Sequence, residues 1–155
     1  TLIAFRRAVE DVAVEADDAV VQAAAGLNSK DCVEREAALR NLERVAKRGD
    51  VYTTTAMRVC LSDPAWQVRR AAVKAFATLA APSRESQLVE AIAGLRKDAA
   101  WQVRREVACT LGEIAGGLDA CINVMADLTI DWRGEVVHEA LRTLKRLAGH
   151  GQPSA

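Results

Sequence analysis

The sequence predicts an all-α protein in which pairs of antiparallel helices stack into a solenoid. One segment, Asp63–Arg70 (DPAWQVRR), is repeated almost unchanged at Asp98–Arg105 (DAAWQVRR), and weaker copies begin at Asp31 and Asp131. The alanine near the end of each copy falls at position 46, 80, 115 or 148, so the copies are 34, 35 and 33 residues apart. A fixed period of this length is typical of solenoid proteins. Apolar residues recur at helical spacing, and no segment alternates as a strand would.

Start and stop signals divide the chain into one leading helix and four repeats. The leading helix is expected at 2–16, the repeats at about 18–48, 50–81, 84–116 and 118–148, and a flexible tail at 149–155. Residues 1–148 are thus predicted to form a single repeat domain. Aspartates are expected to open the helices, and Asp63 is predicted as an N-cap with Pro64 as the first helical residue. The other capping candidates are Asp17 or Asp18, Asp31, Asp98 and Asp131.

The apolar residues of each helix fall on one face, and this face predicts the core. In the second helix of the second repeat the face consists of Val68, Ala72, Val73, Phe76, Leu79 and Ala80. Its copies in the last repeat include Val136, Leu141, Leu144, Leu147 and Ala148. In the first helices of the last two repeats, the residues expected to point inward are Leu88, Ile92, Leu95, Cys121, Ile122, Met125 and Leu128.

Composition excludes several kinds of function. The 155 residues carry 21 Lys and Arg against 21 Asp and Glu, so no overall charge attracts nucleic acid or a membrane. Four cysteines without a C-x-x-C pair, together with two histidines, do not form a zinc motif, and no cofactor is expected. Reduced thiols that act as small apolar residues indicate an intracellular, cytoplasmic location. No apolar run is long enough to span a membrane. The absence of an initiating Met suggests a fragment of a longer chain.

The repeated segment resembles the second helix of HEAT repeats, in which Asp-Pro-x-x-x-Val-Arg precedes an Ala-rich face. The resemblance rests on Asp63–Phe76 and Asp98–Leu111 and extends more weakly over about 18–148. It is most similar to the short repeats of phycobilin lyase subunits and deoxyhypusine hydroxylase. The resemblance implies a right-handed α-solenoid that serves as a protein-interaction scaffold, an adaptor or a subunit of a larger assembly.

The resemblance also implies a ladder of ion pairs between adjacent repeats. Such ladders join an arginine of one repeat to a capping aspartate, and a half-buried arginine needs such acceptors. The expected ladder residues are Arg35, Arg69, Arg104, Asp63 and Asp98. Binding of a ligand is the alternative role for these arginines.

The face of the second helices that lies opposite the core is rich in Arg and Lys, and we call it the basic stripe. The resemblance to HEAT repeats implies that this face lines the concave side of the solenoid. The residues of the basic stripe are Arg40, Arg44, Arg70, Lys74, Arg105, His138, Arg142 and Arg146. Two interpretations stay open: a surface that binds an acidic segment of a protein partner, or an ordinary solvated helix face. Trp66 and Trp101 occupy the same repeat position, where they are expected either to anchor a partner or to pack along the stack.

Enzymatic activity is not expected. Deoxyhypusine hydroxylase holds two irons with His-Glu pairs, and only His138-Glu139 matches such a pair here, with Arg105 and Arg70 in place of further histidines. No nucleophile–histidine arrangement and no phosphate-binding glycine loop is present. The alternatives to a protein-binding scaffold are nucleic-acid binding through the basic stripe, which is less expected, and a bilin-lyase-like or chaperone-like subunit. The sequence leaves the oligomeric state open.

Overall fold

The computed structural model describes residues 16–79, 85–114 and 119–150, and these residues are all-α, which confirms the predicted fold class. The chain divides into two compact units, Thr1–Ser83 and Arg84–Ala155. These are called unit 1 and unit 2. The leading helix expected at 2–16 lies outside the described residues.

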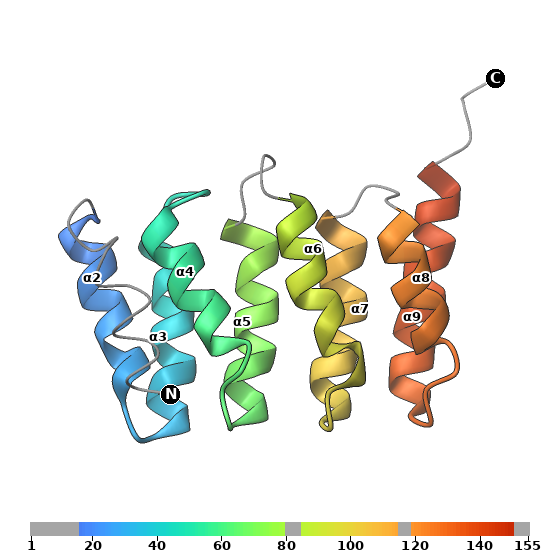
Figure 1. Ribbon diagram of the computed structural model, residues 1–155, viewed down its shortest axis with the longest axis horizontal. Coiled ribbons are helices and arrows are strands. Elements are labelled where there is room, and N and C mark those ends of the chain that lie inside the picture. Colours follow the sequence, from blue (N-terminus) through green and yellow to red (C-terminus); the bar gives the residue numbers. More distant parts are fainter. Residues whose placement is uncertain (1–15, 80–84, 115–118, 151–155) are drawn as a thin grey trace. The chain divides into compact units, whose positions relative to one another are not determined.

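Unit 1 contains two antiparallel helix pairs (Figure 1). The first pair is α2 (Asp18–Ala25), extended by the 3-10 turn η2 (Gly26–Asn28), and α3 (Cys32–Val45). The second pair is α4 (Val51–Cys60) and α5 (Trp66–Leu79). The first helices α2 and α4 contact each other, and the second helices α3 and α5 pack together along the other layer.

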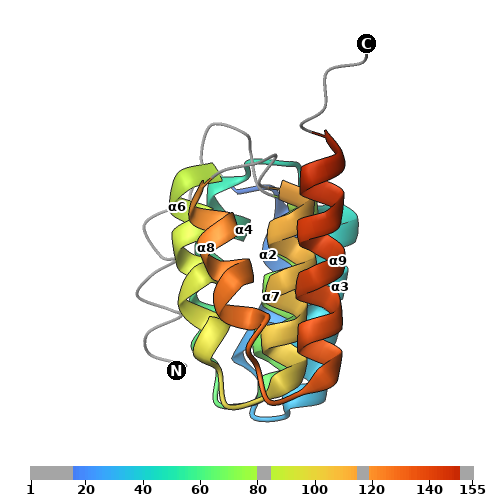
Figure 2. The same cartoon turned by 90° about the vertical axis from the view of Figure 1, so that its right-hand side faces the viewer.

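Unit 2 repeats this arrangement. Its first helices are α6 (Glu85–Ala93), which continues into the 3-10 turn η4 (Gly94–Lys97), and α8 (Asp119–Leu128). Its second helices are α7 (Trp101–Ile114) and α9 (Gly134–His150). Seen from the end in Figure 2, α6 and α8 form one layer and α7 and α9 the other. The helix α9 includes 149 and 150, so only 151–155 of the predicted tail lie outside the described residues.

Aspartates open α2 and α3 as predicted, and an aspartate that was not predicted as a cap opens α4. Asp17 and Asp31 are N-caps whose carboxylates accept hydrogen bonds from the backbone N–H groups of Ala19 and Val33, each at 2.9 Å. Asp50 caps α4 in the same way. A side chain that satisfies a free N–H at a helix start stabilises the helix by about 1 kcal/mol.

The predicted starts of the later second helices were wrong. The helix α5 begins at Trp66, so Asp63 is not its N-cap and Pro64 is not helical. The Asp63 carboxylate instead accepts from the N–H of Ala65 at 2.8 Å, in the turn before the helix. The guanidinium of Arg69 donates hydrogen bonds to the carbonyl oxygens of Asp63 and Pro64. These two carbonyls therefore accept from the arginine side chain and not from backbone N–H groups of the helix. Asp98 and Asp131 form the same turn before α7 and α9. Their prediction as N-caps was also wrong, because these helices begin at Trp101 and Gly134.

The predicted core face of α5 is confirmed. Phe76 is fully buried, together with Val68, Ala72 and Val73, and Leu79 is nearly so; Ala80 lies outside the described residues. Ile92, Cys121, Met125 and Leu128 are buried as predicted, whereas Leu95 is half-buried. The side chain of Leu88 is not among those that the structure describes. Small alanines on these faces let the helices approach closely.

Three predicted core residues are exposed, and Ala148 at the end of α9 is one of them. Ile122 was expected to point inward from α8 but is 43% exposed, because Cys121 and Met125 fill the inward face one position to its side. Leu141 of α9 is 53% exposed, although its copy Val73 is fully buried. Within the described part of unit 2, α9 packs against α7 and α8. Leu141 is exposed because it lies on the part of the α9 surface that faces neither helix.

A close helix contact holds α7 against α9. A side chain at Gly112 would place its Cβ 2.5 Å from Thr143 Cγ2, so only glycine fits without a shift. Thr143 is buried and its hydroxyl donates to the carbonyl oxygen of Ala108 at 3.2 Å, which fixes its rotamer. Glycine at this position therefore allows a close approach of the two helices.

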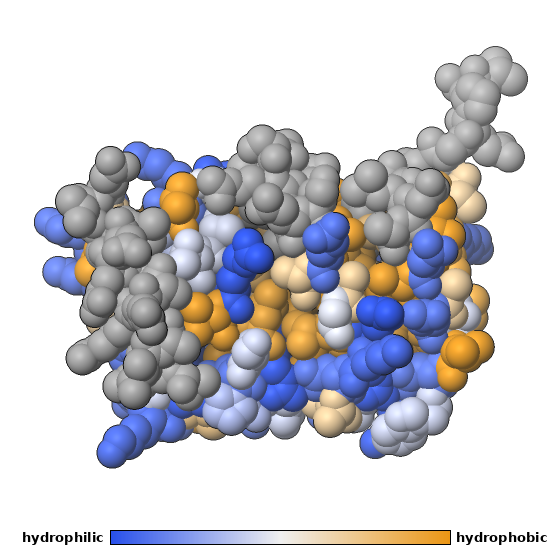
Figure 3. Space-filling model, viewed as in Figure 1, coloured by the Kyte–Doolittle hydropathy of each residue, from blue (hydrophilic) through white to orange (hydrophobic). Residues whose placement is uncertain are grey.

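In the view of Figure 3, both hydrophilic and apolar residues are exposed on the described surface of each unit. No helix within 16–79, 85–114 and 119–150 is long and apolar enough to cross a membrane.

Candidate functional site

Two buried ion pairs join neighbouring repeats, one in each unit, and we call them the inter-repeat ion pairs. In unit 1, Arg35 of α3 donates from Nε and from one terminal nitrogen to the two carboxylate oxygens of Asp63, both at 2.8 Å. In unit 2, Arg104 of α7 binds Asp131 in the same bidentate way, at 2.6 and 2.8 Å. Because each aspartate precedes the second helix of the following repeat, each pair connects two hairpins.

Arg35 and Arg104, and also Arg69, close the turn before their own helix. One terminal nitrogen of each guanidinium donates to two backbone carbonyl oxygens that lie five and six residues earlier, at 2.7 to 3.3 Å. The acceptors are Ser29 and Lys30 for Arg35, Asp63 and Pro64 for Arg69, and Asp98 and Ala99 for Arg104. These donors are directed at the protein itself, which favours a structural role over ligand binding.

The inter-repeat ion pairs are buried, and their hydrogen bonds outweigh the cost of removing the charges from water. The side chains of Arg104 and Asp131 are 6% and 7% exposed, and those of Arg35 and Asp63 are similarly covered. The hydrogen bonds to Asp63 and Asp131 raise the pKa of Arg35 and Arg104. In return, the hydrogen bonds from Arg104 lower the pKa of the Asp131 carboxylate. Charge-assisted bidentate pairs of this kind are among the stronger hydrogen bonds in proteins.

Sequence analysis missed one of the acceptors. Asp131 was recognised as a helix-opening residue but was not assigned to the ladder. It stands in register with Asp63 and Asp98, so the repeat period alone would have identified it. Asp98 accepts a hydrogen bond from the N–H of Ala100 at 2.8 Å.

In unit 1 the basic stripe is organised around Glu36. The Glu36 carboxylate pairs with Arg40, one turn later on α3, at 2.8 Å, and with Arg70 on the neighbouring α5, at 3.9 Å. Glu36 is only 18% exposed, whereas the two arginine side chains are 56% and 42% exposed. One negative charge therefore holds two solvent-facing guanidinium groups.

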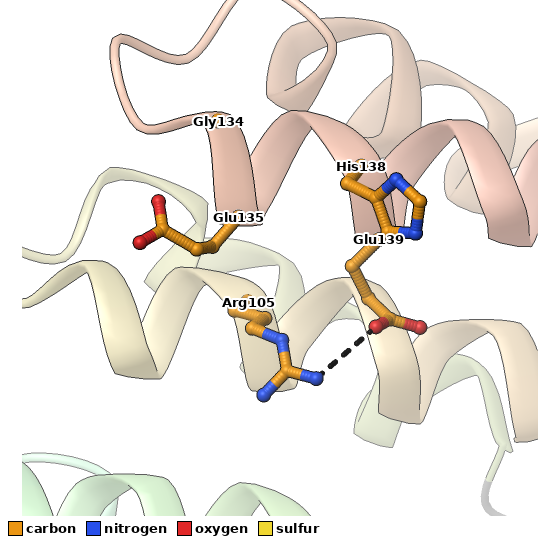
Figure 4. Close-up of a pocket in the computed structure, with 5 residues that line it drawn as sticks. All are labelled: Arg105, Gly134, Glu135, His138 and Glu139. Carbon is orange, nitrogen blue, oxygen red and sulfur yellow. Dashed lines mark hydrogen bonds and ion pairs between the residues drawn. The ribbon is translucent and has the colours of Figure 1, made fainter.

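In unit 2 Glu139 has the corresponding role. Its carboxylate, 7% exposed, pairs with Arg105 of α7 at 3.4 Å and with Arg142 of α9 at 3.8 Å. Figure 4 shows Arg105 reaching from α7 toward Glu139, with His138 beside Glu139 on α9. Sequence analysis missed Glu139 as a partner of the stripe, although Arg105 lies one repeat before it and Arg142 one turn after it.

The other predicted stripe residues, Arg44, Lys74, Arg146 and His138, are exposed on the same layers of helices. Trp66 and Trp101 are half-buried at the first positions of α5 and α7, and the guanidinium of Arg70 lies over the Trp66 ring at 5.7 Å. Trp132, which was not predicted as a site residue, is 74% exposed. Its ring lies beside the guanidinium groups of Arg104 and Arg133, so it covers the inter-repeat ion pair of unit 2.

All four cysteines are free. Burial raises the pKa of Cys60 to about 12 and of Cys121 to about 11. Burial, followed by the nearby Glu113 carboxylate, raises the pKa of Cys109 to about 11. Thiols with such pKa values are weak nucleophiles near neutral pH. Within the described ranges, no three His, Cys, Asp or Glu side chains are grouped so that they could hold a metal ion.

Comparison with known proteins agrees with this architecture. Residues 55–81, which include most of α4 and all of α5, match the family model of the HEAT repeat. This stretch is therefore similar in sequence to a HEAT repeat. The match to the general HEAT repeat leaves the phycobilin lyase and deoxyhypusine hydroxylase subtypes as predictions. No curated protein matches the chain.

One similar solved structure is the crystal structure of an engineered protein from the Northeast Structural Genomics Consortium. It is 22% identical, with a TM-score of 0.66 over 85% of this chain. The match spans 63% of the engineered chain's length. At this level of identity the similarity shows the fold alone.

Proposed function

We propose that the chain is a non-catalytic protein-interaction scaffold, or a subunit of a larger assembly, that binds acidic protein segments along its second helices. The observation that carries the proposal is the pair of arginines held by one buried glutamate in each unit. Each cluster keeps a net positive charge and presents guanidinium groups whose orientation is already restricted. Pre-positioned donors lose less side-chain entropy when they bind a partner's carboxylates.

Charge removal tests this proposal. The triple variant R70Q/R105Q/R142Q is expected to weaken binding of a fluorescent poly-Glu peptide at least tenfold, about 1.4 kcal/mol, while helicity by circular dichroism is unchanged. The matched control is K30Q/R58Q/K97Q, which makes the same change in net charge at residues outside the second helices. Equal loss in both variants, or no loss in the first, would refute the proposal.

Nucleic-acid binding is the second candidate, because guanidinium groups recognise phosphate as readily as carboxylate. A salt titration with DNA and RNA duplexes of matched length separates the two functions. Phosphate contacts give a steep decrease in affinity with salt. Tighter binding of nucleic acid than of poly-Glu at physiological salt would favour this second function.

The four free thiols support a reducing, intracellular environment. We infer a cytoplasmic location from them, and fractionation of cells that express the protein tests it.

A further inference from the structure

A recess opens to solvent at the start of α9, in unit 2. Its volume is about 450 Å³, and its lining consists of Arg105 from α7 and of Gly134, Glu135, His138 and Glu139 from α9 (Figure 4). This volume lies within the range of ~300–1,000 Å³ that is usual for small ligand pockets. Glu139 and Arg105 are paired with each other, so part of the lining is held in place.

The recess lies where the second and third repeats carry an indole. Gly134 is the first residue of α9, as Trp66 is of α5 and Trp101 is of α7. Four residues after Trp66, the guanidinium of Arg70 lies over the ring at 5.7 Å. The corresponding pair in α9 is Gly134 and His138. An imidazole therefore stands in the place of the guanidinium, and the indole ring has no counterpart. A Cβ added at Gly134 would meet nothing within 4 Å.

We propose that this recess binds an aromatic side chain, best a tryptophan, that belongs to the acidic partner segment. The inference rests on the proposed function and adds an anchor residue to the segment. The partner's ring would stand beside His138 and Arg105 as Trp66 stands beside Arg70. Aromatic rings bind guanidinium and imidazolium groups through their faces, and the carboxylate of Glu135 is an acceptor for the indole N–H. Because Glu139 holds Arg105, the guanidinium needs little reordering on binding.

Binding of a neutral probe tests the recess without the charged segment. N-acetyl-L-tryptophanamide is expected to shift the amide NMR signals of Gly134, Glu135 and His138 saturably, with a dissociation constant on the order of 1 mM. N-acetyl-L-leucinamide should bind at least tenfold more weakly. The variant Gly134→Trp supplies the missing indole from the protein itself and is expected to weaken probe binding at least tenfold without loss of thermal stability.

The matched control is Gly94→Trp. It adds the same side chain to unit 2 at η4, where a Cβ also meets nothing within 4 Å, and should leave probe affinity unchanged. Equal probe binding by Gly134→Trp and the wild-type protein would overturn the inference. So would saturable shifts that centre on Trp132 instead of Gly134.

A second measurement separates this inference from the proposed function. A poly-Glu peptide that carries one Trp is expected to bind the wild-type protein at least tenfold more tightly than the same peptide with Ala. That advantage should vanish in Gly134→Trp. If both peptides bind equally well, the recess is not an aromatic site, yet the acidic-segment proposal stands. If neither peptide binds but the neutral probe does, the proposed partner chemistry fails and the recess remains.

Discussion

The two units reach the same arrangement of charges from different sequence positions. In unit 1 the glutamate that holds two arginines is Glu36, on the earlier of the two second helices. In unit 2 the glutamate is Glu139, which lies on α9, the later of the two second helices. The position of Glu139 in the repeat is occupied by an alanine in α3 and in α5. Packing of neighbouring second helices brings both glutamates within reach of an arginine across the contact. The shared feature is therefore a glutamate on one second helix that pairs with an arginine on the neighbouring second helix. The position within the repeat does not determine which of the two helices carries the glutamate.

The largest change in stability is expected when the inter-repeat ion pairs are broken. Asp131→Ala removes the acceptor of the buried Arg104 and is expected to destabilise unit 2 by about 3–5 kcal/mol. Asp63→Ala should do the same to unit 1. Amide hydrogen exchange measures the effect, which should appear in α7 and α9 for Asp131→Ala and in α3 and α5 for Asp63→Ala.

Two further variants identify the cause of that loss. Asp131→Asn keeps an acceptor for the Arg133 N–H and removes only the charge, so it should be milder than Asp131→Ala. The double variant Arg104→Met/Asp131→Leu removes both charges and should recover much of the stability. Unchanged exchange in α7 and α9 after Asp131→Ala would show that the pair does not stabilise unit 2.

The close contact at Gly112 is a feature of unit 2, because α3, the earlier second helix of unit 1, has Glu43 at the corresponding position. Gly112→Ala is expected to destabilise the protein by about 1–3 kcal/mol, since the added Cβ meets the fixed Thr143 methyl group. Urea unfolding measures the change. Gly94→Ala, which meets nothing, should be neutral or slightly stabilising. Thr143→Ser removes the methyl group and should relieve Gly112→Ala; an additive loss would contradict the steric explanation.

The smallest expected effect is on the pH dependence of unit 2. Asp131 has a lowered pKa in the folded protein, so its pair with Arg104 stabilises fully above the ordinary aspartate pKa of about 3.9. That stabilisation is lost as pH falls from about 4 through the lower folded pKa. Unfolding measured between pH 6 and pH 2 should show a decline that Asp131→Asn reduces. An identical pH profile for the variant would mean that the pair does not contribute to acid sensitivity.

The sequence was sufficient for features that depend on period and local propensity. The helix order and the buried face of α5 followed from apolar spacing, because helices of a solenoid must cover one another's apolar faces. Asp17 and Asp31 were predicted as caps because short polar side chains there satisfy free N–H groups.

Features that depend on contacts between helices were not predictable in this way. The starts of α5 and α7 were placed too early, because an arginine side chain from within the helix itself competes for the turn carbonyls. The start of α9 was also placed too early, although α9 has Val137 at the position of that arginine. Glu139 was overlooked because its two partners come from different helices. Ile122 was misplaced because a one-position rotation of α8 decides which neighbour faces inward.

The arginine that links repeats has a consequence for how the units unfold. Its guanidinium serves two structures at once, the turn that starts its own helix and the aspartate of the next hairpin. Detaching one hairpin therefore also weakens the start of the helix it leaves behind. Each unit should lose its structure as one cooperative block, and a lone hairpin cut from either unit should have little helix of its own.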